Sequence, residues 1–449
     1  MFETIAPVEA PAQAATADLA GRWEGSLRVG ETALPIVIRV AQSPDGLVAV
    51  MDSPAQNARD IPVSGIAKLS GVVRFVVPSA NGRFEGAASE DGSTWTGVWS
   101  QGGASLPLVL TRTAAVTEAV GPERPQTPKP PFAYVAEDVT FDNAAITLVG
   151  TLTLPQGPGP FPAVVLLTGS GAQDRDQTIL GHKPFAVWAD ALTKRGVAVL
   201  RYDDRGVGGS GGGSTEETTA DFATDAAAAM AFLRTRPEIE AARIGLMGHS
   251  EGAATALIAI ANGAPAAFVV MIAGPSVSGA EILSEQAREI VLASGGAAEQ
   301  ADQTRQIQAR LMAAVVENKD DGPAAISAVA AQLVALGQTP EQAHQAAVPM
   351  GWGWYRYFAA YDPGPTLSTL RTPLLALYGG LDRNVPAEQN RAALARLKPD
   401  ADIVVLPGLN HLMQQAASGL PVEYGTIRET LAPEAIATVV DWVVRTAAE

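Results

Sequence analysis

The chain contains no cysteine, and only four of its 449 residues are histidine. Without thiols it can form neither a disulfide bond nor a thiolate metal site. The histidines are His182, His249, His344 and His411, and no two of them stand at the spacing that metal ligands use. We therefore expect no bound metal, and the scarcity of histidine narrows the choice of a catalytic base.

Basic side chains are also few. The chain has 31 lysines and arginines against 47 aspartates and glutamates, a formal net charge of −16. A nucleic-acid partner would require a basic face, so this composition argues against one. Long apolar runs are missing too, and none approaches the length of a membrane span.

Residues 1–18 are rich in alanine and proline and lack the basic-then-apolar layout of a signal peptide. We expect a disordered leader here. The alternative is that this segment remains after a signal peptide has been removed. The compartment stays open, because the second case implies a periplasmic or secreted protein and the first a cytoplasmic one.

A chain of this length is too long for one ordinary core, so two domains are expected. Residues 19–112 show short alternating patterns and no helical period, which predicts a small antiparallel barrel or sandwich. The expected strands are Trp23–Leu27, Leu34–Val40, Leu47–Met51, Val72–Val77, Gly82–Gly86, Trp95–Trp99 and Leu106–Leu110. We expect the tryptophans Trp23, Trp95 and Trp99 in the barrel core rather than around a ligand.

Residues 113–131 contain five prolines, which predicts an extended linker before a catalytic domain at 132–449. In that domain strands and helices alternate. Apolar runs such as Ala163–Leu167 suit strands that are buried on both faces of a mostly parallel sheet.

A largely helical block at residues 276–363 interrupts the alternation, and we interpret it as a lid. Its end is rich in aromatic residues, and Trp352, Trp354 and Tyr357 are candidates for the wall of a substrate pocket. The alternative is that these rings only form the packing seam between lid and sheet.

The sequence Gly248-His249-Ser250-Glu251-Gly252 lies between a predicted strand and a predicted helix. A serine between two glycines at such a turn is typical of a nucleophile elbow, in which a strained backbone lifts the hydroxyl clear of the sheet. Ser250 is therefore the candidate nucleophile.

A serine hydroxyl needs a histidine to take its proton and a carboxylate to orient that histidine. Asp382 and His411 each follow a predicted strand, in the order serine, acid, histidine. Elimination favours His411, because His249 precedes the nucleophile and is expected to point away, and the other two lie before the elbow and in the lid. The rival carboxylates Asp400 and Asp402 precede a strand.

An oxyanion hole needs two backbone donors. We predict the N–H of Glu251, which follows the nucleophile, and the N–H of Ser170 in the turn Thr168–Gly171. The Glu251 side chain needs no catalytic role, since a carboxylate in the first helical turn is favoured by the helix dipole.

On these residues the chain resembles the α/β-hydrolase superfamily, within it the bacterial esterase branch near dienelactone hydrolases and serine aminopeptidases. The similar stretches are Thr168–Asp176, Arg201–Gly208, Gly248–Gly252, Gly379–Asp382 and Asn410-His411. Members often carry a β-rich N-terminal domain, so the resemblance covers most of the chain and implies an α/β-hydrolase fold with a helical lid after a small β-domain.

One residue departs from the family's pattern, and three charged residues lie outside the triad. The family usually has histidine where this chain has Thr168, which affects the oxyanion turn. Asp203, Asp204 and Arg205 have no place in the triad, and we interpret them as a structural salt-bridge turn rather than as substrate contacts.

These observations predict a cofactor-free serine hydrolase that cleaves carboxylic esters of small to medium acyl groups, with a small-molecule ester as its partner. The oligomeric state is left open, a homodimer among the alternatives. A peptidase or amidase with the same triad is the main alternative, in which Glu251 or the pair Asp203 and Asp204 would bind an amine. A non-catalytic binding protein on a hydrolase fold is the third. The glycine-rich Gly206–Gly213 lacks the features of a dinucleotide loop.

Overall fold

The computed structural model describes residues 19–29, 32–43, 46–56, 58–69, 71–77, 80, 82–101, 104–114, 124–214 and 216–448. The chain divides into two compact units, Met1–Pro122 and Glu123–Glu449. The expected leader at residues 1–18 and part of the expected linker, residues 115–123, lie outside the described residues.

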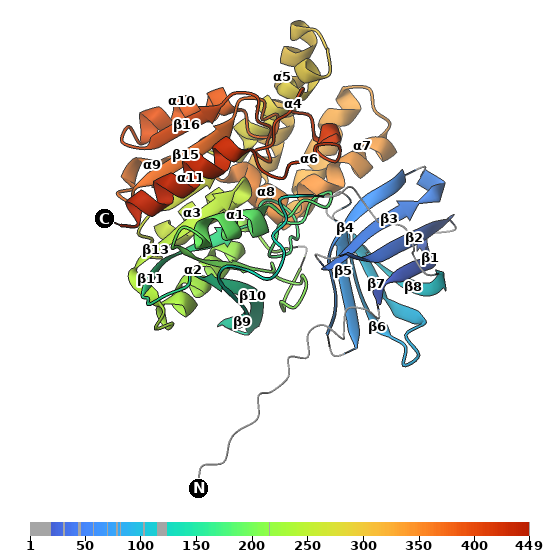
Figure 1. Ribbon diagram of the computed structural model, residues 1–449. Coiled ribbons are helices and arrows are strands. Elements are labelled where there is room, and N and C mark those ends of the chain that lie inside the picture. The colour runs from blue at the N-terminus through green and yellow to red at the C-terminus, as the bar shows by residue number, and fades with distance from the viewer. Residues whose placement is uncertain are drawn as a thin grey trace. The chain divides into compact units, whose positions relative to one another are not determined.

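The first unit is a closed antiparallel barrel in which each strand pairs with the next and β1 pairs with β8 (Figure 1). Its strands are β1 (Gly21–Val29), β2 (Thr32–Ser43), β3 (Gly46–Ser53), β4 (Ala58–Leu69), β5 (Val72–Val77), β6 (Gly82–Ala88), β7 (Thr94–Gln101) and β8 (Ala104–Ala114), with a 3-10 turn at Pro54–Gln56. The sequence predicted seven of these strands and missed β4.

Large aromatic side chains fill the barrel. Trp23 and Trp95 stack with ring centroids 3.6 Å apart, and both are buried, as is Trp99. Phe75 packs against Phe84 and against both Trp95 and Trp99. The prediction that the three tryptophans are core residues is confirmed.

The second unit is built on an eight-stranded sheet of order β16-β15-β14-β13-β11-β12-β10-β9. β10 is antiparallel to both its neighbours, and the other neighbouring pairs are parallel. The strands are β9 (Val135–Asn143), β10 (Ile146–Leu154), β11 (Phe161–Leu167), β12 (Ala198–Tyr202), β13 (Ile239–His249), β14 (Val269–Ile272), β15 (Leu374–Gly379) and β16 (Asp402–Leu406). β11, β14 and β15 consist almost entirely of apolar residues, as burial on both faces requires.

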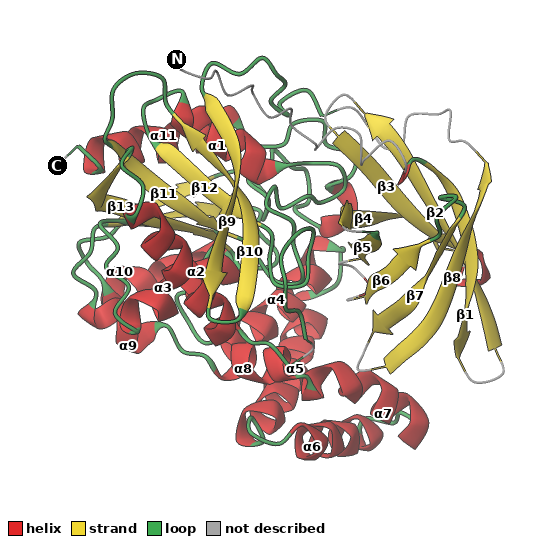
Figure 2. Cartoon of the chain, turned by 90° about the horizontal axis from the view of Figure 1, so that it is seen from below, coloured by secondary structure: helices red, strands yellow, loops and turns green. Residues whose placement is uncertain are grey.

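Helices cover both faces of this sheet (Figure 2). On one face α1 (Pro184–Thr193) and α11 (Pro433–Thr446) pack on the alternate strand residues that include Val164, Leu166 and Val199. On the other face lie α2 (Thr219–Arg234), α3 (Glu251–Ala261) and α10 (Ala387–Leu397). α3 is rich in alanine, which lets it approach the sheet closely.

A helical insertion occupies the chain between β14 and β15. It contains α4 (Gly279–Ala293), α5 (Ala298–Glu317), α6 (Gly322–Ala335), α7 (Pro340–Ala347), a 3-10 turn (Val348–Gly351), α8 (Gly353–Ala360) and α9 (Gly364–Thr369). α5, α6 and α7 share a small core of their own that includes Met312, Val315 and Val329. α8 reaches back to the sheet unit, since Tyr357 packs against the main core.

Candidate active site

The turn between β13 and α3 has the geometry of a nucleophile elbow. Ser250 adopts φ 54° and ψ −119°, a conformation that costs a non-glycine residue energy. Its N–H donates to the Ile272 carbonyl of β14 at 2.8 Å. The two glycines are required by close approach: a Cβ at Gly248 would lie 2.1 Å from the Gly252 carbonyl, and a Cβ at Gly252 would lie 2.1 Å from the Leu167 oxygen.

Asp382 and His411 form a buried pair beyond the ends of β15 and β16. His411 Nδ1 lies 2.8 Å from Asp382 Oδ2. The other carboxylate oxygen accepts the backbone N–H groups of Asn384 and Val385, each at 2.8 Å. Because these bonds fix the carboxylate as an acceptor, Nδ1 of His411 carries the proton and Nε2 is left as a base.

The strand order brings the three predicted triad residues to one edge of the sheet. β13, β14, β15 and β16 are parallel neighbours, and Ser250, Asp382 and His411 follow the carboxyl ends of the first, third and fourth. The ring of His249, next to Ser250, lies 4.8 Å from that of His411. Among the described residues Ser250 Oγ makes no hydrogen bond, so a contact between Ser250 and His411 Nε2 stays a prediction.

The turn after β11 lies beside the elbow. A Cβ added to Gly169 would come within 3.4 Å of Ser250 Cβ. The Gly169 N–H donates to Gln177 Oε1 at 3.2 Å. Within the described part of the chain the N–H groups of Ser170 and Glu251 have no acceptor, so both are available to a substrate oxygen.

Asp204 binds the turn after β11 through two hydrogen bonds. Its carboxylate accepts the Thr168 hydroxyl at 2.7 Å and the Gln173 N–H at 2.9 Å, and burial raises its pKa well above the ordinary value. Asp203 is bound by the Arg175 guanidinium at 2.8 Å and by the Arg175 N–H at 2.9 Å. Thr168 thus links this turn to the loop that follows β12.

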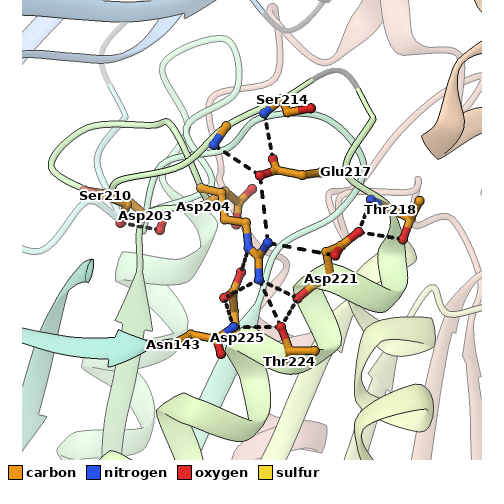
Figure 3. A network of polar contacts seen from close by, with 12 residues as sticks. Asn143, Asp203, Asp204, Ser210, Ser214, Glu217, Thr218, Asp221, Thr224 and Asp225 are labelled. Carbon is orange, nitrogen blue, oxygen red and sulfur yellow. Dashed lines mark hydrogen bonds and ion pairs between the residues drawn. The ribbon is translucent and has the colours of Figure 1, made fainter. Parts of the chain in front are cut away.

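Arg205 continues this structural network away from the elbow. Its guanidinium pairs with Asp225 at 2.5 Å and also contacts Thr224, while Asn143 binds the same two residues (Figure 3). Asp203 and Arg205 are therefore ion-paired within the protein, and Asp204 is held by hydrogen bonds. This geometry agrees with a structural salt-bridge turn.

The Glu251 side chain, a carboxylate in the first turn of α3, is buried, with 2% of its surface exposed. It accepts the Thr219 hydroxyl at 2.7 Å and the Trp354 indole N–H at 2.8 Å to each oxygen. Burial raises its pKa, while hydrogen bonds from Thr219, Ser170 and Trp354 act in the opposite direction. The carboxylate therefore joins α8 of the insertion to the residue after the nucleophile.

The predicted pocket residues divide between two places. Trp354 stacks on Phe358 and reaches Glu251. Tyr357 stacks on Tyr361 and lines a cavity of about 610 Å³. The described lining of that cavity includes Glu216, Thr218, Lys319, Asp320 and Arg356 but no triad residue.

Trp352 precedes α8 and is partly buried. Its buried Nε1 has no hydrogen-bond partner among the described residues. A role of Trp352 or Tyr357 in holding substrate therefore stays a prediction.

Sequence reasoning missed two residues at this site. Gln177 has 4% of its surface exposed and contacts both Gly169 and His249. His249, expected to point away, instead bonds the His411 carbonyl at 2.9 Å. His249 was visible in the elbow motif, whereas nothing in the sequence distinguishes Gln177 from other polar loop residues.

In the described part of the chain, no group of three or more His, Asp or Glu side chains is arranged to hold a metal ion. The same residues contain no helix with the length and apolarity to cross a membrane.

The sheet order, the helices on both faces and the strained serine between β13 and α3 define an α/β hydrolase. The chain belongs to the family described as serine aminopeptidase, S33, which it matches over residues 183–415. That range contains Ser250, Asp382 and His411 but begins after the turn Thr168–Gly171, which is predicted to supply an oxyanion donor.

Individual relatives cover only part of the chain. Esterase EstD of Thermotoga maritima is 30% identical over 297 residues, which are 66% of this chain and 64% of the esterase. An uncharacterized protein of Mycobacterium tuberculosis is 36% identical over 145 residues, 32% of this chain and 47% of that protein. The chain thus spans less than two thirds of the length of these relatives. The solved α/β hydrolase GrgF from Penicillium sp. sh18 is 18% identical, with a TM-score of 0.45 over 70% of this chain and 100% of its own.

Proposed function

We propose that this protein is a serine hydrolase that cleaves carboxylic esters of small to medium acyl groups. The observation that supports the proposal is that a strained Ser250 and a buried Asp382–His411 pair follow the carboxyl ends of neighbouring parallel strands, at the same edge of the sheet. The similarity to an esterase over 66% of the chain supports the ester as substrate class.

The first half of the reaction forms an acyl-enzyme. Ser250 Oγ attacks the ester carbonyl carbon while its proton passes to His411 Nε2, and Asp382 stabilises the resulting imidazolium. The carbonyl oxygen becomes an oxyanion, which accepts the N–H groups of Glu251 and Ser170. When the carbon–oxygen bond breaks, His411 returns the proton to the departing alkoxide, and an alcohol leaves.

The second half restores the enzyme. Water attacks the acyl carbon of the Ser250 ester and gives its proton to His411. The tetrahedral intermediate then collapses, His411 protonates Ser250 Oγ, and the carboxylic acid leaves. No metal or redox partner enters this balance.

A peptidase or amidase with the same triad is the second candidate, and the family description is the reason to keep it. Such an enzyme needs an anchor for a charged amine. Glu251, Asp203 and Asp204 were the candidates, but the first is engaged by Thr219 and Trp354 and the other two by the loop after β11. This occupancy favours the ester.

The test compares wild type with Ser250→Ala on p-nitrophenyl esters of rising chain length and on aminoacyl-anilides. We expect ester turnover in wild type and a loss of at least about 10³-fold in the variant, because the nucleophile is gone. A fluorophosphonate probe should label wild type and not the variant. A variant that keeps a tenth of the activity would contradict the assignment of Ser250, and an unlabelled wild type would favour a non-catalytic binding protein.

A further inference from the structure

A chain of three hydrogen bonds runs beneath the candidate triad. The Gly169 N–H lies 3.2 Å from Gln177 Oε1, Gln177 Nε2 lies 2.8 Å from His249 Nδ1, and His249 Nε2 lies 2.9 Å from the His411 carbonyl oxygen. This series of hydrogen bonds therefore begins in the turn Thr168–Gly171, which is predicted to supply an oxyanion donor, and ends on the backbone of the candidate base His411.

The two backbone groups at the ends of this series decide which atom donates in each hydrogen bond. The Gly169 N–H can only donate, so the Gln177 atom that it meets is the oxygen, and the amide nitrogen faces His249. The amide N–H then donates to Nδ1, which leaves the proton of His249 on Nε2, where it meets the carbonyl of His411. This assignment requires a neutral imidazole, and burial together with the neighbouring His411 lowers the pKa of His249 to about 3.

Both linking residues are held rigidly. Gln177 and His249 are buried, with 4% and 8% of their surfaces exposed. Gln177 adopts φ 51°, an unusual value for a residue other than glycine, and its N–H donates to the Asp174 carbonyl. A residue that is kept in such a conformation, with both the oxygen and the nitrogen of its amide hydrogen-bonded, has little freedom to move. It therefore holds Gly169 and His249 at a fixed distance from each other.

We propose that Gln177 is a positioning residue, which acts through His249 to fix the oxyanion turn relative to the backbone of His411. This inference rests on the proposed ester hydrolysis. In this proposal Gln177 contacts neither the substrate nor Ser250. Its effect is on the distance between the oxyanion donors, at Ser170 and Glu251, and the imidazole that moves the proton.

The experiment uses Gln177→Met in the full-length chain, which keeps the side chain's length and removes both hydrogen bonds. We expect kcat for a p-nitrophenyl ester to fall about 10- to 100-fold, because small errors in the placement of transition-state groups are costly. KM should change by less than about threefold, since the acyl pocket is untouched. Labelling of Ser250 by a fluorophosphonate should slow by a similar factor.

Gln126→Met is the matched control. Gln126 is also a glutamine that bridges backbone groups, namely the N–H of Leu431 at 3.0 Å and its carbonyl at 2.7 Å, but it contacts no residue of the candidate site. The Gln126→Met variant should have a lower Tm, because these hydrogen bonds are lost, while its kcat stays within about twofold of wild type. If Gln177→Met keeps kcat within threefold, or if both variants lose kcat in proportion to Tm, the positioning role is wrong.

A double variant tests whether Gln177 and His249 act through the same series of hydrogen bonds or independently of each other. If Gln177 acts through His249, Gln177→Met combined with His249→Phe should be no slower than the slower single variant. Losses that multiply would overturn the proposal even if each variant alone is slow. Failure of the proposed function gives a different result, because wild type itself would then not hydrolyse the esters.

Discussion

At the scale of single residues, the four histidines differ in what holds each ring. His411 is paired with Asp382, His249 and His182 are buried with backbone partners, and His344 is exposed on α7. A base must have one free ring nitrogen near the nucleophile. Only His411 combines a carboxylate partner with a position at the edge that bears Ser250.

We therefore expect His411→Ala to lower kcat for esters by at least about 10³-fold, because neither the attack nor the departure of the alcohol would have a proton acceptor or donor. His344→Ala should leave kcat within about twofold. Steady-state kinetics on one p-nitrophenyl ester checks both. If His411→Ala kept wild-type activity, the assignment of His411 as the base from the order serine, acid, histidine would be wrong.

Chelation supplies a second test at this scale. The chain has no thiolate, and its four histidines include no pair at ligand spacing. Turnover should be unchanged after prolonged dialysis against EDTA. Loss of turnover that zinc restores would contradict the expected metal-independent mechanism.

The sequence predicted the candidate triad because each member follows a strand end, and strand ends can be recognised from apolar runs. It could not predict the neighbours that orient the triad. The bonds of Gln177, and of Glu251 to Trp354, join segments far apart in the chain, and no local pattern encodes such a meeting.

At the scale of elements, β4 shows why one strand was missed. Gly65 has φ 60°, and the pairing of β4 with β5 shifts register between Ser64 and Ala67. Such a bulge breaks the period of two on which strand prediction depends. The strand also carries charged residues near its start and contains Pro62, and both features are unusual in a strand.

α8 connects the insertion to the candidate site, and its aromatic residues permit a test of the lid interpretation. We expect Trp354→Ala to raise KM for esters of longer acyl chains more than for acetate, because the variant removes a rigid wall next to the residue after Ser250. The measurement is KM across a chain-length series. An unchanged profile would make the contact with Glu251 a packing feature only.

Tyr357→Ala is the comparison within the same helix. Tyr357 lines the cavity of about 610 Å³, which contains no triad residue among its described lining. A matching shift of KM in this variant would place the acyl chain in that cavity. A shift in Trp354→Ala alone would confine the acyl group to the side of α8 that faces Glu251.

At the scale of the whole molecule, the division into a β-rich part and an alternating α/β part was predictable from the change of apolar period. The number of barrel strands and the closure of the barrel were not, because closure depends on pairing between β1 and β8 at opposite ends of the unit.

Buried titratable groups give the folded chain two opposite dependences on pH. Burial lowers the pKa of His182 from 6.5 to about 4, so between these values the unfolded chain binds a proton that the folded chain does not. This contribution to stability is full above pH 6.5 and is lost as pH falls. Burial raises the pKa of Glu251, so its contribution is full at acidic pH and is lost as pH rises.

Two neutral substitutions separate these contributions. The Tm of His182→Gln relative to wild type should improve as pH falls from about 6.5 to about 4, because the glutamine cannot be protonated. The Tm of Glu251→Gln relative to wild type should improve in the opposite direction, as pH rises above the ordinary carboxyl range, because the glutamine cannot ionise in the buried site. Thermal melts of the three proteins from pH 4 to pH 8 measure both differences. Curves that stay parallel over this range would mean that neither group is perturbed by burial, whereas slopes of opposite sign are the expected result.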